Sequence, residues 1–178
     1  MDRVYCQRIL GFFPIYVDNI GDCTQVLIEG EDYLVIEKTI ATFLKLILRY
    51  YMIDLGEIRD IYSKYTNSRN LVPIPFDSYN IFIPFKARRP IYENDRAFGY
   101  FNLNYVEDFL YGPSGVLVVF RDGQSLKCIS REKTFRKHLK NGKIVKLCYE
   151  KREMPRPNRQ EDRLRTLIDE IKDIIKNN

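Results

Sequence analysis

Apolar positions recur with a helical period between residues 38 and 51. That spacing puts the apolar side chains on one broad face of an α-helix, with Lys45 and Arg49 on the other side. The pattern therefore predicts a core helix over residues 38–51. A shorter helix is expected from Leu55 to Tyr65. The apolar positions of the first helix are Ile40, Phe43, Leu44, Ile47, Leu48 and Tyr51.

Aromatic and β-branched runs separated by turn residues predict strands through much of the remaining chain. Two of the runs flank Gly30, which predicts a hairpin there, and Asp122-Gly123 marks a second hairpin. The prolines at 73, 75 and 84 favour strand ends or sheet edges, because proline cannot donate to a ladder. The expected strands lie within residues 12–17, 24–28, 33–36, 71–76, 79–85 and 100–109.

The stretch after the second hairpin predicts a short basic helix over residues 131–140. Ser130 is suited to the N-cap position, and Gly142 to the position just past the C-terminal end. Residues Ile144–Tyr149 are then expected to form one more strand.

The last part of the chain predicts a separate appendage. Met154–Pro157 breaks the pattern, and residues 159–176 carry apolar positions with helical spacing. We expect a linker and an amphipathic helix over residues 154–178, which either folds back on the core or pairs with another subunit. The whole pattern predicts an α+β fold, mainly antiparallel sheet, with its principal domain in residues 1–153.

Composition narrows the class of protein. The chain has 178 residues, 45% of them hydrophobic and 30% charged, which is typical of a globular cytoplasmic protein. No apolar run approaches the roughly 20 residues that span a bilayer, and the first residues do not form a secretion signal. Membrane association is therefore not expected. The four cysteines are scattered without a C-x-x-C pair, which favours reduced thiols over a metal site.

Catalytic motifs are not evident. The chain has no G-x-S-x-G elbow, no phosphate-binding P-loop and no G-x-G-x-x-G fingerprint. His138 is its only histidine, and the surrounding Lys and Arg side chains disfavour the protonated imidazole. We expect a solvated surface histidine, no enzyme activity, and neither a cofactor nor a bound metal.

Positive charge is concentrated in one part of the chain. Arg121–Arg165 contains 15 Lys and Arg against 6 Asp and Glu, whereas residues 1–120 contain 12 against 15. Segregation of this kind predicts a surface that meets a polyanion, and double-stranded DNA is the expected partner. The side chains expected to neutralise phosphates are Lys133, Arg136, Lys137, Lys140 and Lys143, with Arg69, Arg121 and Lys127 as further contacts.

The order of these parts resembles the ComK family of bacterial competence transcription factors. The likeness spans roughly residues 15–175, and it rests on many short segments in the same order. The resemblance implies an activator that binds AT-rich boxes as a dimer or a pair of dimers. It also implies contact with RNA polymerase and control by an adaptor and a protease. The segments are the Gly30 hairpin, Leu48–Tyr51, Pro73–Phe85, Arg89-Pro90, Gly99-Tyr100, Val119–Leu126 and Glu161–Arg163.

A second set of residues is similar in layout to LytTR-type DNA-binding domains. These are Arg88–Pro90, Asn102–Val106, the Asp122-Gly123 hairpin and Ser130-Arg131. The similarity implies a mostly antiparallel β fold that puts loops into successive DNA grooves. Arg88, Arg89 and Arg131 would then enter the grooves, and Arg89 and Arg131 would read base edges.

Two other functions stay open on the sequence alone. The basic face would equally suit a protein-interaction module that meets an acidic partner. A nuclease would share the same charge and would show metal-dependent cleavage of DNA.

Overall fold

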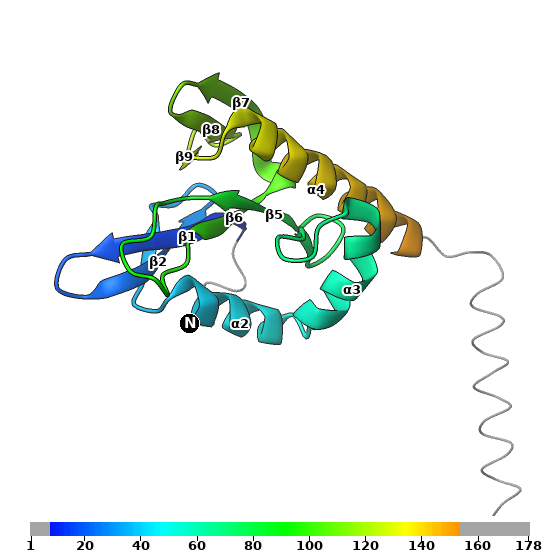
Figure 1. Ribbon diagram of the computed structural model, residues 1–178, viewed down its shortest axis with the longest axis horizontal. Coiled ribbons are helices and arrows are strands. Elements are labelled where there is room, and N and C mark those ends of the chain that lie inside the picture. Colours follow the sequence, from blue (N-terminus) through cyan, green and yellow to red (C-terminus); the bar gives the residue numbers. More distant parts are fainter. Residues whose placement is uncertain (1–7, 154–178) are drawn as a thin grey trace, which may run out of the picture.

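Two antiparallel sheets and three α-helices form the part of the chain that the structure, a computed structural model, describes: residues 8–153 (Figure 1). The prediction of an α+β fold dominated by antiparallel sheet is confirmed. The linker and the amphipathic helix expected over residues 154–178 lie outside the described residues.

The larger sheet has six strands in the order β3-β2-β1-β6-β5-β4. The β2–β3 pair is the hairpin predicted around Gly30, whose φ of 70° falls in the left-handed region that glycine adopts easily. The strands are β1 (Ile9–Val17), β2 (Gly21–Ile28), β3 (Leu34–Ile36), β4 (Ile74–Pro75), β5 (Ile81–Lys86) and β6 (Phe98–Asn102).

The two faces of this sheet bury two separate cores. Phe12, Val26 and Phe82 face one core, while residues next to them in the same strands face the other. The register of β1 shifts between Ile9 and Gly11, so the strand bulges there. A sheet covered on both faces explains why β1 and β5 are apolar in nearly every position.

The first core is closed by helix α2 (Ile40–Tyr50), as its predicted apolar face requires. Thr39 caps α2 by accepting a hydrogen bond from the Thr42 amide at 3.3 Å. Helix α3 (Leu55–Thr66) follows, and Asp54 caps it by accepting from the Glu57 amide at 3.0 Å. Both helices were predicted at these positions.

The second core is covered by a small sheet of order β7-β8-β9 and by the start of helix α4 (Figure 1). Its strands are β7 (Val106–Gly112), β8 (Gly115–Phe120) and β9 (Ser125–Cys128). The single strand expected over residues 100–109 is wrong. The chain makes a 3-10 turn at Leu103–Tyr105 and crosses from one sheet to the other. A continuous apolar pattern cannot reveal such a crossing, because both strands bury a face in the same core.

Helix α4 runs from Glu132 to Glu153 without interruption, so the prediction of a helix ending at Lys140 and a strand over Ile144–Tyr149 is wrong. The predicted N-cap also moves by one residue. Arg131, and not Ser130, offers the carbonyl that accepts the first helical hydrogen bond, from the Phe135 amide at 3.0 Å.

Packing explains why the helix continues through a β-branched segment. Gly142 is buried against Ile83 of β5, and the absence of a side chain lets the helix axis come close to the sheet. One turn further on, Val145 packs with Tyr62 of α3 and with Val72. These contacts outweigh the low helix propensity of valine and glycine, which differs from that of alanine by only about 1 kcal/mol or less per residue.

Replacing Gly142 by Ala is expected to destabilise the fold. The new methyl group would lie 2.3 Å from Cδ1 of Ile83 and 2.6 Å from its Cγ1. Overpacking of this kind costs about 1–3 kcal/mol, against a gain of about 1 kcal/mol in helix propensity. Urea denaturation should therefore show a net loss of up to about 2 kcal/mol.

The matched test is a double mutant with Ile83→Val, which removes the Cδ1 atom closest to the new methyl group. Gly142→Ala should cost less in the Ile83→Val background than in the native chain. Additive losses would show that the contact with Ile83 is not what requires glycine here.

Candidate nucleic-acid interface

Helix α4 exposes a continuous stripe of basic side chains on the face turned away from the sheets. The helix carries eight Lys and Arg side chains against three Glu. The exposed cations recur every three or four residues, which places them along one side of the helix. At 22 residues the helix is about 33 Å long, at 1.5 Å per residue. This basic stripe consists of Lys133, Arg136, Lys137, Lys140 and Lys143, and Lys151 continues it toward the C-terminus.

A hollow of about 660 Å³ lies where the start of α4 meets the loop after α3. Arg69 comes from that loop, and Lys133 and Lys137 come from the helix, so three cations from two distant parts of the chain line one space. We call it the basic hollow. No carboxylate lines it. Its other lining residues are Ser68, Asn70, Leu71, Thr134 and His138.

The end of α3 determines where Arg69 lies. Asn67 ends that helix in the left-handed conformation, at φ 48°, which turns the chain sharply. The Thr66 hydroxyl donates to the Tyr62 carbonyl at 2.9 Å, and the Tyr62 side chain is buried in the cluster that joins α3 to α4. The packing of the two helices thus places the Ser68–Leu71 loop beside α4.

The position of the basic hollow on α4 adds to its affinity for anions. Lys133, Thr134 and Lys137 lie in the first two turns of the helix, where the aligned peptide dipoles produce a partial positive charge. Helix N-termini are common sites for phosphate binding for this reason. Serine, threonine and asparagine side chains in the lining can donate further hydrogen bonds to phosphate oxygens.

His138 is buried, with 7% of its surface exposed, so the prediction of a solvated surface histidine is wrong. Burial lowers the pKa of His138 below its ordinary value of 6.5, and the charge of Lys137 lowers it further. The Nδ1 atom of His138 and the Nδ2 atom of Asn141 have no hydrogen-bond partner among the described residues. Buried polar atoms of this kind are uncommon, and two of them lie within one turn of α4 beside the basic hollow.

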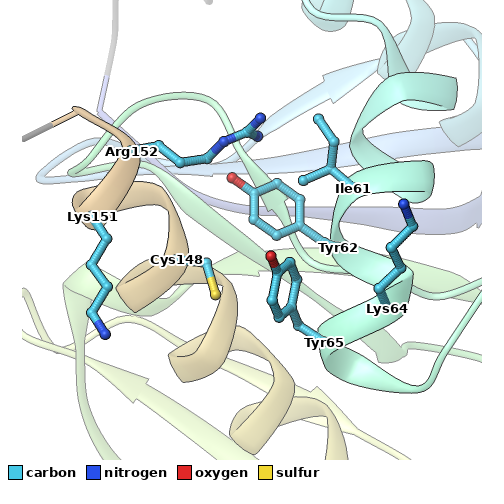
Figure 2. A pocket seen from close by; sticks show the side chains of 7 residues that line it. All are labelled: Ile61, Tyr62, Lys64, Tyr65, Cys148, Lys151 and Arg152. Atoms are coloured by element: carbon cyan, nitrogen blue, oxygen red, sulfur yellow. The ribbon is translucent and has the colours of Figure 1, made fainter. Parts of the chain in front are cut away.

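Another hollow, of about 540 Å³, lies between α3 and the C-terminal end of α4 (Figure 2). The rings of Tyr62 and Tyr65 extend from α3 into the space between the helices, and the Arg152 side chain reaches across from α4 toward Tyr62 (Figure 2). Lys64 and Lys151 also belong to its lining, which contains no carboxylate. The cationic surface therefore continues along both ends of α4.

Arg89 and Arg131 belong to two segments that meet. The Ile129 amide donates to the Lys86 carbonyl at 2.8 Å. This contact lies two residues before Arg131 and three residues before Arg89. Both arginines are exposed. The structure thus places the two segments side by side at Lys86 and Ile129, and the reading of base edges by Arg89 and Arg131 remains a prediction.

Arg88 is held inside the protein instead. Its Nη2 atom donates to Asp22 at 2.7 Å, and its guanidinium carbon lies 3.8 Å from the centre of the Tyr16 ring. Only 10% of the Arg88 side chain is exposed. Arg88 therefore ties its loop to the β1–β2 hairpin, and Arg89 is the residue of this pair that faces solvent.

The remaining predicted contacts lie apart from the basic hollow. Arg121 sits in the β8–β9 turn, which docks on the β2–β3 turn because Asp122 accepts from the Gly30 amide at 3.0 Å. Lys127 is exposed on β9. Arg136 is partly neutralised, since its Nε donates to Glu132 at 2.6 Å and its guanidinium lies 4.3 Å from the centre of the Tyr111 ring.

The part of the chain that the structure describes contains no cluster of three His, Cys, Asp or Glu side chains suited to a metal ion. Cys23, Cys128 and Cys148 are free thiols, and the first two are buried. None of the helices within residues 8–153 combines the length and apolar character needed to cross a bilayer.

No protein-family model matches the chain, and neither a curated protein nor a solved structure matches it. The resemblances to the ComK and LytTR families therefore rest on the short segments quoted for them. What they imply about function remains a prediction.

Acidification is expected to destabilise the fold through His138. The unfolded chain binds a proton near pH 6.5, whereas the folded chain binds it only at lower pH because burial depresses the pKa of this imidazole. The stability that His138 contributes is therefore complete above about pH 6.5 and is lost as the pH falls through its folded pKa.

The test compares the native chain with His138→Gln by urea denaturation at pH 7 and pH 5. The loss of stability over this interval should be smaller in the variant. Asp95 and Asp122 do not obscure the comparison, because both proteins carry them and their carboxyls, with an ordinary pKa of 3.8, bind protons in the unfolded chain mostly below pH 5. Equal losses in the two proteins would contradict the assignment.

Proposed function

We propose that this chain is a DNA-binding transcription regulator that meets duplex DNA with the basic stripe of α4 and the basic hollow. One observation carries the proposal. Arg69 and the lysines of α4, which are far apart in sequence, line one space without a carboxylate, at the N-terminus of the helix. Cations that serve only to keep a surface solvated have no reason to line one shared space.

The residues divide into two roles. Lys133, Lys137 and Lys140 neutralise phosphates, which supplies affinity for any sequence and makes binding sensitive to salt. Arg89 and Arg131 enter the grooves and discriminate among sequences. Their exposure and the contact between their segments support this division.

The family resemblance supports the finer part of the proposal. By likeness to ComK, the protein is an activator of the competence type that binds AT-rich boxes as a dimer or a pair of dimers. AT-rich tracts have a narrow minor groove whose negative potential attracts arginine, which suits Arg89 and Arg131 as reading residues.

Titration of the purified full chain with AT-rich and GC-rich duplexes at two salt concentrations tests the function. Fluorescence anisotropy should show binding near physiological salt, tighter to the AT-rich duplex and weaker for both at the higher salt. A lack of duplex binding near physiological salt would overturn the proposal. Metal-dependent cleavage in the same titration would indicate a nuclease.

Replacing Lys133, Lys137 and Lys140 together by Ala tests the phosphate contacts. Binding should weaken for all sequences, and the slope of log K against log salt should flatten by about three units, roughly one for each lost contact. The ratio between AT-rich and GC-rich affinities should change little, because these contacts carry no sequence information.

The matched control replaces Lys38, Lys45 and Arg49 by Ala. These three cations are exposed at α2, on the side of the large sheet away from α4, and their removal changes the net charge by the same amount. Affinity and salt slope should stay close to native. An equal effect of both triple variants would show that net charge, and not the α4 surface, governs binding.

An acidic protein partner is the second candidate for the basic face. Leu110 and Leu117 favour this alternative, because they face each other across β7 and β8 and are 51% and 36% exposed. An exposed apolar pair beside a charged face is common at protein interfaces. The duplex titration separates the two functions, since an interaction module binds DNA weakly near physiological salt.

A further inference from the structure

A third hollow, of about 310 Å³, lies between α2, α3 and the start of β6. Part of its lining comes from α2, which covers the face of the large sheet opposite α4 (Figure 1). Its walls are largely aliphatic, and its volume falls at the lower end of the roughly 300–1,000 Å³ typical of small-molecule sites. The apolar walls include Ala41, Leu44, Leu48, Leu55, Leu71 and Phe98.

Three cations belong to the lining of this apolar hollow, and no carboxylate does. Lys45 comes from α2, Arg59 from α3 and Arg96 from the loop before β6, so three separate segments direct positive charge to one place. None of the three forms an ion pair with another described residue. The planar guanidinium groups of arginine suit a carboxylate, which they can hold with two parallel hydrogen bonds.

Tyr100 connects the charged and apolar parts of the hollow. Its ring is stacked on Phe12 with centroids 5.3 Å apart, and only 9% of the residue is exposed. Burial raises the pKa of Tyr100, while the positive charges of Arg59 and Arg96 act on the same phenol in the opposite direction and by less. The phenol therefore stays neutral, and both guanidinium groups lie within electrostatic range of it.

We propose that this hollow binds a carboxylate carried on a short aliphatic chain, a ligand of the medium-chain fatty-acid class. The chain lies along Leu44, Leu48 and Leu55, and the carboxylate faces Arg59 and Arg96. Apolar walls provide affinity without direction, and the cations select an anion over a neutral or cationic head group. The site shares Asn70 and Leu71 with the basic hollow but none of its cations, and its occupancy does not depend on the proposed function.

Isothermal titration calorimetry of the full chain, without DNA, tests the site with three ten-carbon probes below their micelle concentrations. Decanoate should bind at least tenfold more tightly than decanol, and decyltrimethylammonium should bind more weakly than either. Among carboxylates, affinity should rise about fourfold for each added methylene from hexanoate to decanoate. Equal affinity for decanoate and decanol would overturn the proposal.

The variant Arg59→Gln/Arg96→Gln should lose at least tenfold in decanoate affinity and keep its affinity for decanol. Both side chains are exposed, so the variant is expected to fold. The matched control is Arg49→Gln, an exposed cation of α2 that does not line the hollow and should leave decanoate binding unchanged. Decanoate binding that is unaffected by the double variant would show that the ligand lies elsewhere.

Amide shifts locate the ligand independently. In a ¹H–¹⁵N spectrum, decanoate should move the signals of Ala41, Leu55, Leu71 and Ala97, which belong to four different segments of the lining. Shifts confined to the exposed pair Leu110 and Leu117 would indicate adsorption to the small sheet and would overturn the proposal. Because no duplex is present, these outcomes are independent of whether the protein binds DNA.

Discussion

The close approach of α4 to β5 at Gly142 and Ile83 determines where this protein carries its positive charge. The eight cations of α4 repel one another, and only a narrow stripe of the helix surface is apolar. Phe135 anchors one end in the core between the sheets, stacked on Phe101, and Val145 anchors the other part against α3. Between these anchors the chain needs a residue without a side chain. With α4 held in this way, the face opposite the sheets remains free for lysine and arginine.

Much of the fold could be predicted from the sequence, because its signals are local. The helical spacing from Ile40 to Tyr51 and the turn residues at Gly30 and Asp122-Gly123 each reflect contacts within a few residues. The failures concern contacts between distant segments. From the sequence alone, Gly142 is typical of the position just past a helix. Only the contact with Ile83 explains a glycine inside the helix. The crossing at Leu103 is hidden because Phe101 before it and Val106 after it pack in the same core.

The candidate interface could be predicted in composition but not in arrangement. The charge surplus marked Lys133, Lys137 and their neighbours from the sequence, since exposed cations on a helix follow from periodicity. Which arginines join them depends on tertiary contacts. An ion pair with Asp22 and a contact with the Tyr16 ring keep Arg88 in place, whereas Arg69 lies in the basic hollow because of where α3 ends. The burial of His138 was equally hidden, because it depends on the loop and sheet that cover one side of α4.

The loop after α3 borders two of the hollows at once. Asn70 and Leu71 line both the basic hollow and the apolar one, so these two residues lie between a cationic surface and an aliphatic cavity. An occupant of one hollow that displaced Asn70 and Leu71 would change the shape of the other hollow. Thermodynamic reciprocity then applies: whatever factor one occupant imposes on the affinity of the second, the second imposes on the first. Few residues would need to move for a metabolite to adjust how tightly a polyanion is held.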